Sequence, residues 1–318
     1  MFTRRSGIVL IALPLVALSG CSALVTAKRD YSLTSPWSGY ERVLVKSVNG
    51  SIDVSVATTP EVRITGVTRA GGATFEEAEH NVDQVQVVAK ADPSSARTLL
   101  VSVEYPESLR GKSVGANIKV ELPQPAAAEL TSSNGSISAG GTRGVIARTS
   151  NGAITLRDIA GGGEARTSNG GVEAERVSGP LTIESGNANI VARNIVGDLT
   201  VETSNGRVDV SDIRGNLRVR TSNGSIRAAA RPKPDGVIEL QTSNGSITAG
   251  VPEDVRGIVS LATSNGSVKP NLGPVKFSVV KWSARDFEAE LNGGGSGRFT
   301  ASTSNGSIEL TSFAARNE

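Results

Sequence analysis

The hexapeptide TSNGSI at residues 221–226 decides the fold, because close copies of it recur along the chain. The copies are TSNGAI at 149–154, TSNGGV at 167–172, TSNGRV at 203–208, TSNGSI at 242–247, TSNGSV at 263–268 and TSNGSI at 303–308. A catalytic site needs its residues only once, in one place. A short polar motif repeated this faithfully indicates a structural repeat or an array of identical binding positions.

The asparagine of each Asn-Gly pair measures the repeat. These asparagines stand at 134, 151, 169, 205, 223, 244, 265 and 305, so the spacings are 17, 18, 36, 18, 21, 21 and 40 residues. The spacing of 36 hides a degenerate copy, ESGNANI at 184–190, which places Asn187 where the motif is due. The spacing of 40 predicts another hidden copy near Ala284.

Apolar and small residues alternate within each repeat. After Asn205 the set comprises Val208, Val210, Ile213, Leu217, Val219 and Thr221. Steps of two are typical of a β-strand, and each break in the alternation predicts a corner. Since Asn and Gly adopt positive φ at low cost, we expect the Asn-Gly pair to turn the chain in that conformation, and Gly215 and its equivalents to mark a second corner. Thr221 shares the parity of the core residues and is expected to face inward.

A period of about 18 residues matches one coil of a β-solenoid with about three short strands. We therefore predict an all-β fold, a parallel β-solenoid (β-helix) of about nine coils, for which right-handed crossovers are favoured. Stacking would place each asparagine about 4.8 Å above the previous one, so that the amides can form a hydrogen-bonded ladder. The residues predicted to form this structural corner are Asn134, Gly135, Asn151, Gly152, Asn169, Gly170, Asn205, Gly206, Asn223, Gly224, Asn244, Gly245, Asn265, Gly266, Asn305 and Gly306.

Residues 1–20 have the pattern of a bacterial export signal. Arg4 and Arg5 precede an apolar run that is too short to span a bilayer as a helix. The tetrapeptide LSGC at 18–21 resembles a lipobox, in which the cysteine becomes the lipidated first residue of the mature protein. We predict that Cys21, the single cysteine, carries the acyl chains, such as palmitate, that anchor the protein in a membrane.

The residue after the cysteine bears on localisation. Ser22 resembles the outer-membrane sorting signal of lipoproteins in diderm bacteria. We predict a lipid-anchored protein of the cell envelope, in the outer membrane if the host is diderm. Removal of the signal leaves 31 Lys and Arg against 31 Asp and Glu, and the formal charge falls from +2 to 0. This balance predicts no nucleic-acid partner.

The repeated hexapeptide in an exported chain resembles the putative-adhesin, β-strand-repeat domain family of bacterial envelopes, a family of unknown function. The resemblance covers residues 40–312 and includes VKSVNGSIDVSV at 45–56 as a first copy of the motif. It implies a non-enzymatic protein and supplies no catalytic residue to carry over.

Five segments are predicted along the chain. They are a lipoprotein signal peptide at 1–20, a lipidated tether at 21–39, an N-terminal capping region at 40–128, the solenoid repeats at 129–313 and a tail at 314–318. The capping region contains irregular strands and a helical patch, TFEEAEHNVDQV at 74–85. Such a cap would cover the open end of the solenoid, where unpaired backbone invites edge pairing.

The sequence predicts no catalytic residue, no metal site and no cofactor. With His80 as the single histidine and Cys21 as the single cysteine, neither a His/Cys metal site nor a Cys-His pair can be assembled. Paired carboxylates are the serious enzymatic alternative, because parallel β-helices host polysaccharide-cleaving enzymes. Asp158 and Asp212 share one coil position, with Asp209 nearby, and we expect them to be solvated surface acids.

The functional prediction is a non-enzymatic cell-envelope lipoprotein with a structural, adhesive or scaffold role. One alternative is a polysaccharide-binding or polysaccharide-cleaving β-helix, and another is an envelope-stress sensing component. A ligand groove would be sought first at the insertions RPKPDG (231–236) and VPEDVRG (251–257), and a glycan site at Trp282 and Phe287 beside Asp286. The predicted partners are the membrane, through the lipid anchor, and an envelope protein or glycan.

Overall fold

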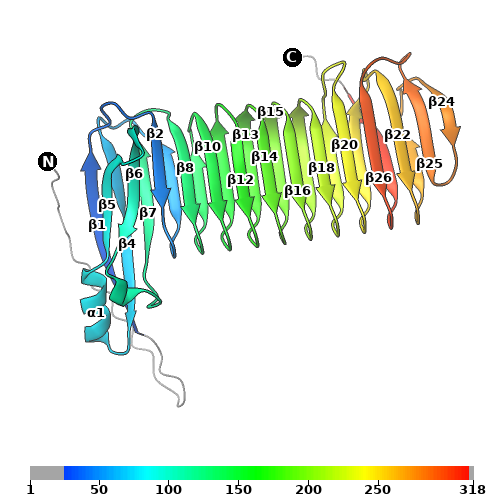
Figure 1. The fold of residues 1–318 in the computed structure, drawn as a ribbon. Helices are drawn as coiled ribbons and strands as arrows, with labels where there is room; N and C mark the ends of the chain where they lie inside the picture. The colour runs from blue at the N-terminus through cyan, green and yellow to red at the C-terminus, as the bar shows by residue number, and fades with distance from the viewer. Residues whose placement is uncertain (1–24, 315–318) are drawn as a thin grey trace. The chain divides into compact units, whose positions relative to one another are not determined.

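The computed structural model describes residues 25–314, which belong to two compact units, Met1–Gly152 and Ala153–Glu318. Both units are built from stacked strands that form two sheets with the core between them (Figure 1). The predicted all-β solenoid is confirmed. None of the helices among the described residues is both long and apolar enough to cross a membrane.

The first unit contains the start of the repeat. One sheet has the strand order β1-β4-β7-β3-β9 and the other the order β10-β8-β2-β6-β5. The strands are β1 (Val25–Ser35), β2 (Arg42–Lys46), β3 (Ile52–Val56), β4 (Val62–Gly72), β5 (Gln86–Asp92), β6 (Ser95–Glu104), β7 (Gly115–Leu122), β8 (Ala127–Ser132), β9 (Ile137–Gly140) and β10 (Gly144–Thr149). Strands β2 and β3 pair in parallel with β8 and β9. The motif copy at Asn49 therefore stacks directly on the copy at Asn134, although the chain between them makes a long excursion.

Two local features of this unit bear on the predicted segments. The helical patch forms α1 (Phe75–Asp83), and the Thr74 hydroxyl caps it by accepting a hydrogen bond from the Glu77 backbone N–H at 3.1 Å. Residues 25–35 lie in the segment predicted to be a tether, but they form β1, which pairs antiparallel with β4 along its whole length. The alternating burial of this segment, with Ala27 and Ser35 inward, favours a sheet position over a free linker.

The second unit contains the regular coils. One sheet has the order β11-β13-β15-β17-β19-β21-β27-β23 and the other the order β24-β25-β22-β26-β20-β18-β16-β14-β12. The strands are β11 (Ile154–Ile159), β12 (Gly163–Thr167), β13 (Val172–Ser178), β14 (Leu181–Ser185), β15 (Ile190–Val196), β16 (Leu199–Thr203), β17 (Val208–Arg214), β18 (Leu217–Thr221), β19 (Ile226–Ala230), β20 (Val237–Thr242), β21 (Ile247–Pro252), β22 (Gly257–Thr263), β23 (Val268–Asn271), β24 (Phe277–Trp282), β25 (Asp286–Leu291), β26 (Arg298–Thr303) and β27 (Ile308–Phe313).

Each regular coil contributes one strand to each sheet, so the prediction of about three strands per coil is wrong. One of the expected corners is a bulge inside a single strand, made by a residue at positive φ. These residues are Asp158, Arg176, Asn194 and Asp212, with φ between 54° and 57°. The second corner lies where it was predicted, and Gly179, Gly197 and Gly215 adopt φ of 150–157° there.

The inward faces of both sheets form a narrow aliphatic core. Val208, Ile213 and Val219, for example, are each 0% exposed. Their neighbours in adjacent coils are in exact register, so Val201 pairs with Val219 and Ile195 with Ile213. The inward and outward assignment made from the alternation is therefore confirmed.

The last repeat in sequence is not the last in space. Strand β26 lies between β20 and β22, and β27 lies between β21 and β23, all in parallel. Residues 277–291, where a hidden copy was expected, instead form the antiparallel pair β24 and β25 beyond β22. The expectation of a hidden copy near Ala284 is wrong, because the long spacing holds an excursion after which the chain returns to fill an interior place.

Candidate functional site: the repeated corner and the exposed surfaces

The motif asparagines form a hydrogen-bonded ladder at an exposed corner. Each side-chain Nδ2 donates to the Oδ1 of the asparagine in the neighbouring coil, over 2.6–2.9 Å. In the first unit the ladder comprises Asn49, Asn134 and Asn151. In the second unit its order is Asn169, Asn187, Asn205, Asn223, Asn244, Asn305 and Asn265. The side-chain amides are thus used to join coils.

The motif glycines are needed for space. Among the described residues, no motif Asn or Gly has a positive φ, so the expectation of a left-handed corner is wrong. A Cβ added to Gly224 would lie 1.8 Å from the backbone oxygen of Gly206, and one on Gly245 would lie 2.0 Å from that of Gly224. Glycine recurs here because backbone packs directly on backbone from coil to coil.

The motif threonines are buried and bridge the coils from inside. The Thr242 hydroxyl donates to the Gly224 carbonyl at 2.9 Å, and the Thr303 hydroxyl to the Gly245 carbonyl at 2.9 Å. The predicted inward facing of this row is confirmed, since Thr242 is 3% exposed. Thr203, which stacks on the degenerate copy, is the exception: its buried hydroxyl has no hydrogen-bond partner among the described residues.

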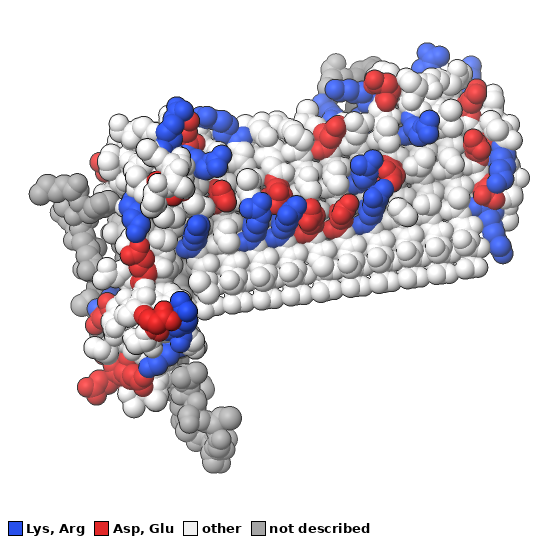
Figure 2. Space-filling model, in the orientation of Figure 1, with Lys and Arg blue, Asp and Glu red and all other residues white. Residues whose placement is uncertain are grey.

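Four of the six positions of the hexapeptide therefore have a structural role. Thr, Asn and Gly join neighbouring coils, and the final Ile or Val enters the core, as Ile226 does at 1% exposure. The Ser before the asparagine and the residue after the glycine, such as Ser222 and Ser225, face solvent without a contact of this kind, whereas the exposed asparagines form the ladder. Figure 2 shows a band without charged side chains along one edge of the stacked strands. The hexapeptide is accounted for by coil stacking rather than by a row of ligand sites.

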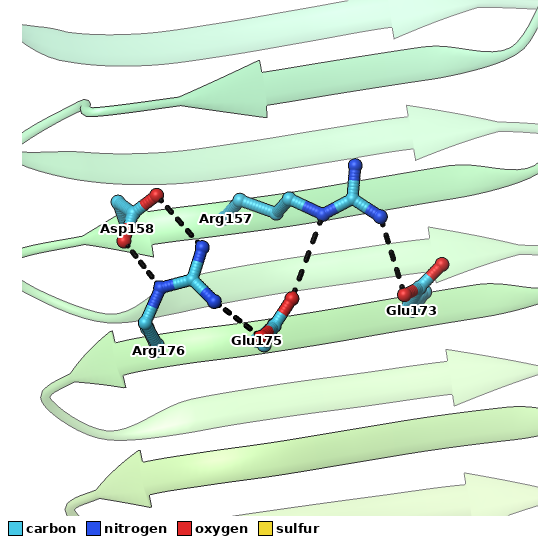
Figure 3. A network of polar contacts seen from close by, with 5 residues as sticks. All are labelled: Arg157, Asp158, Glu173, Glu175 and Arg176. Atoms are coloured by element: carbon cyan, nitrogen blue, oxygen red, sulfur yellow. Dashed lines mark hydrogen bonds and ion pairs between the residues drawn. The ribbon is translucent and has the colours of Figure 1, made fainter.

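Asp158, one of the acids considered for catalysis, belongs to an ion-pair network on the first regular coils (Figure 3). Arg176 donates to both carboxylate oxygens of Asp158, from Nε at 2.7 Å and from Nη2 at 3.1 Å, and also contacts Glu175. The hydrogen bond from Arg176 holds the pKa of Asp158 below its usual value. Arg157 contacts Glu175 at 3.7 Å and Glu173 at 3.3 Å. Exposed pairs of this kind add little to stability.

The structure does not bring Asp158 and Asp212 together. Both occupy the bulge position of their coils, but Arg176 and Asn194 occupy it in the two coils between them. Three coil steps place the two carboxylates about 14 Å apart. The paired carboxylates of glycoside hydrolases lie about 5–9.5 Å apart. Asp209 is paired with Arg207 at 3.7 Å.

The other candidate residues lie apart from one another. His80 is exposed on α1. The insertions at 231–236 and 251–257, where a ligand groove would be sought first, line a space of only about 20 Å³, which holds about one water molecule. No group of three or more His, Cys, Asp or Glu side chains among residues 25–314 is placed to hold a metal ion. Cys21 lies outside the described residues.

The predicted aromatic candidate divides between core and surface. Phe287 is 1% exposed and belongs to the core, whereas Trp282 is 61% exposed. Their rings meet edge to face with centroids 5.7 Å apart. Asp286 pairs with Lys281 at 3.3 Å and accepts a hydrogen bond from the Ser283 hydroxyl. No second acid accompanies Asp286 in these contacts.

Sequence reasoning missed two hollows of the first unit. One of about 520 Å³ lies between β1, α1 and β5, where Tyr31 donates its hydroxyl to the Asn117 carbonyl at 2.9 Å and burial raises its pKa. The other, of about 300 Å³, is lined by Trp37 and Tyr40, whose ring centroids are 5.8 Å apart, together with Glu41, Arg97 and Arg143. The clustering of Trp37 and Tyr40 in the sequence was the available signal.

Outward charges of the second unit alternate in blocks of like sign, since Arg166, Glu184, Glu202 and Arg220 stack in that order (Figure 2). Arg166 pairs with Glu184 at 3.0 Å, and Arg220 and Arg218 both pair with Glu239, at 2.7 and 2.8 Å. The hydrogen bonds from Arg220 and then Arg218 lower the pKa of Glu239. Charges paired in this way do not form a basic stripe for a polyanion.

The stacked coils and the motif that builds them correspond to a known family. The model of the Toastrack DUF4097 family matches residues 32–311. The chain belongs to this family. The resemblance drawn from the repeated hexapeptide is thereby confirmed. No curated protein matches the sequence.

Solved structures similar to this Toastrack chain are distant from it. One is named a putative cell adhesion protein, from Clostridium sporogenes ATCC 15579, with 11% identity, a TM-score of 0.22, and coverage of 90% of this chain and 100% of that one. Another is named a putative adhesin, from Bacteroides fragilis NCTC 9343, with 10% identity, a TM-score of 0.33, and coverage of 91% of this chain and 97% of that one. A likeness this distant carries no argument about partners.

Proposed function

We propose that this chain is a non-enzymatic structural or adhesive protein of the bacterial cell envelope. The observation that carries the proposal is the structural role of the repeated residues. Thr, Asn and Gly of the motif make contacts between coils, and Asp158 and Asp212 are too far apart to share a substrate. A stack of this kind presents an extended surface on a rigid core. The adhesive role is supported by the resemblance of the repeated hexapeptide to the putative-adhesin, β-strand-repeat family.

The envelope location rests on the N-terminal sequence. LSGC at 18–21 supplies a lipobox-like cysteine, and a membrane partner follows from acylation of Cys21. A single acyl chain binds membranes only marginally, so stable anchoring needs more than one. A lipid anchor of this type would hold the stacked coils at the membrane surface.

Expression of the full chain in a diderm bacterium tests this proposal. We expect a labelled fatty acid to be incorporated at Cys21, and the wild type to partition with the membranes. Cys21→Ser should incorporate no label and leave the membrane fraction. Cells that display the wild type should adhere to a surface or to one another more than cells that express Val219→Asp, which buries an unpaired carboxylate in the core. Equal partitioning of wild type and Cys21→Ser would contradict the anchor, and equal adherence would contradict the adhesive role.

A polysaccharide-binding role is the second candidate, favoured by the hollow of about 300 Å³ in the first unit. Tyr40 offers aromatic surface over the buried Trp37, and Glu41 and Arg97 at the same hollow form an ion pair. Aromatic rings beside charged groups suit a sugar ring, which has apolar faces and polar edges. Titration of envelope polysaccharide into the wild type and into Tyr40→Ala tests it. Identical binding by the two proteins would contradict a site at this hollow.

A further inference from the structure

Strand β24 ends one sheet of the second unit and is exposed along its whole length (Figure 1). It has β25 on one side and no described strand on the other. Phe277, Val279, Val280 and Trp282 are 38, 46, 66 and 61% exposed. No other strand among residues 25–314 exposes so many large apolar side chains. A contiguous apolar patch on a free strand edge marks an interaction site.

The other strands that end a sheet carry features that discourage pairing. β23 is four residues long and contains Lys269 and Pro270. β1 carries consecutive charges at Lys28, Arg29 and Asp30, and β5 carries Lys90 and Asp92. Charged residues, proline and short length are the usual protections of an edge. β24 contains neither proline nor a run of charges: it carries Lys281, which Asp286 of the same chain engages at 3.3 Å, and one bulge between Val279 and Lys281.

The inward side of β24 continues the apolar core. Phe277 and Trp282 both contact Phe287 edge to face, with centroids 5.8 and 5.7 Å away. Phe277 pairs in register with Leu291, and Trp282 with Phe287, both of which are buried. The rings on β24 therefore occupy core positions for which a further strand is missing.

We infer that the occupant of this edge is β24 of a second copy of the chain, paired antiparallel about a two-fold axis. In that arrangement Phe277 lies opposite Trp282 of the second copy, Ser278 opposite Lys281, and Val279 opposite Val280. Val280 is the extra residue of a bulge between Val279 and Lys281, and this bulge brings Phe277 and Trp282 to the same face of the strand. A row of apolar side chains then runs across the strands from Leu291 through Phe277 to Trp282 of the second copy. Aromatic and β-branched pairs across strands are stabilising, and free backbone groups of both edges on either side of the bulge find partners.

The charges on the outward side complement one another in this register. Within one chain, Ser278 of β24 pairs with Glu290 of β25. In the dimer only the small Ser278 therefore separates Glu290 from Lys281 of the second copy. No like charges lie directly opposite each other. Such an interface is isologous, and it closes as a dimer rather than growing into a fibre. Its small area makes the dimer reversible. The inference depends on neither the lipid anchor nor adhesion.

Sedimentation equilibrium tests the dimer. The protein is the chain from residue 21 onward, which keeps every described residue, with Cys21→Ser to remove the acylation site. The weight-average mass should rise from one chain toward two between concentrations on the order of 1 and 200 µM. Val280→Lys should raise the dissociation constant at least tenfold, because it places like charges at the two-fold axis. Val196→Lys, at a valine 52% exposed on β15, is the matched control and should change nothing.

Each outcome of this measurement decides the inference. Circular dichroism and the melting temperature verify that both variants fold as the wild type does. A wild type that stays monomeric overturns the inference, and so does a Val280→Lys protein that dimerises as well as the control. Association beyond two chains also overturns it, because the proposed interface closes.

Cysteine cross-linking tests the register. In the proposed pairing Ser278→Cys combined with Lys281→Cys places two thiols opposite each other, at about the 5.5 Å Cα separation of a disulfide. Ser278→Cys alone leaves its two copies about 10 Å apart along the strands. Mild oxidation should therefore give covalent dimers of the double variant only. Equal cross-linking of the single variant would overturn the register.

Discussion

Replacement of Gly224 by alanine tests the central packing claim, that coils contact each other through backbone at the motif glycine. The added Cβ would lie 1.8 Å from the Gly206 oxygen and 2.6 Å from the Gly206 carbonyl carbon. Relief to about 3.0 Å requires the two coils to separate locally by about 1.2 Å. The clashing atoms belong to the backbone, so no side chain can rotate away.

The magnitude follows from what that separation breaks. Asn223 Nδ2 donates to Asn205 Oδ1 at 2.7 Å, and the Asn223 backbone N–H donates to the Ser204 carbonyl at 2.9 Å. An extra 1.2 Å puts both pairs beyond hydrogen-bond range. Two net hydrogen bonds of about 0.5–1.5 kcal/mol each, with about 1–3 kcal/mol of overpacking strain, give a loss of about 4 kcal/mol. A loss of this size lowers the melting temperature by roughly 8–16 °C.

The control is Gly171→Ala, two residues after the ladder asparagine Asn169. Its added Cβ would meet only the Asn189 oxygen, at 3.4 Å, and its φ is not positive. We expect it to change stability by no more than about 0.5 kcal/mol. Urea unfolding followed by circular dichroism gives both values. If Gly224→Ala destabilises by less than about 1 kcal/mol, or by the same amount as Gly171→Ala, then the close approach of the coils does not explain the glycine.

The degenerate coil provides an internal rescue experiment. It has Ala188 in the place of the motif glycine, and Gly186 in the place of the preceding serine. A Cβ on Gly186 would lie 2.5 Å from the Ser168 oxygen, so the closest backbone contact has moved to that residue. Ser222→Gly combined with Gly224→Ala copies this pattern and should recover part of the loss. A double variant less stable than Gly224→Ala alone would refute this reading of the degenerate coil.

Further predictions concern the hydroxyl row, the acid response and the inserted repeat. Thr242→Val should cost about 1–3 kcal/mol of unfolding free energy, because the Gly224 carbonyl loses its buried donor. Thr203→Val should cost little, because the Thr203 hydroxyl has no partner among the described residues. Equal losses of the two variants in urea unfolding would contradict this. The folded-state pKa of Glu239 is lowered from 4.5, so its contribution is present above that pH and lost as the pH falls through the folded value. Glu239→Gln should therefore flatten the decline in stability between about pH 5 and 3, and an unchanged decline would count against it. Truncation after Gly295 deletes β26 and β27 and should therefore reduce hydrogen-exchange protection in β20 and β21 as well as in β22 and β23. Full protection in β20 would exclude an interior role for the last repeat.

The facing of each residue could be predicted because alternation is a local property. Val219 and Thr221 are inward and Arg218 is outward, as the steps of two required. The amide ladder could also be predicted, since equal spacing and parallel stacking bring identical residues to the same level. What the alternation could not distinguish was a bulge from a corner. Both shift the parity of the strand, and only the continued pairing of Ile159 with Val177 places the break at Asp158 inside a strand.

The role of the glycines could not be deduced from composition. A glycine serves equally where φ must be positive and where no Cβ fits, and the two needs leave the same letter in the sequence. Gly215 has the first need, with φ of 157°, although a Cβ there would also meet Gly197. Gly224 has only the second. The exposed apolar edge of β24 could not be predicted from the sequence either. It depends on which strand ends the sheet, and the spatial order of the strands differs here from their order in the sequence.

The end of the stack in the second unit is built differently in its two sheets. The inserted repeat gives β22 a parallel neighbour in β26, and β25 covers its other side antiparallel. A further coil would need a parallel neighbour in both sheets, so the change of direction at β25 prevents the repeat from continuing. In one sheet the stack stops at β23, a short strand with Pro270, whereas in the other it extends to β24 with its backbone edge open. Growth by another coil is thus blocked while pairing of one strand remains allowed, which is the condition under which a repeat stack forms a closed dimer instead of a filament.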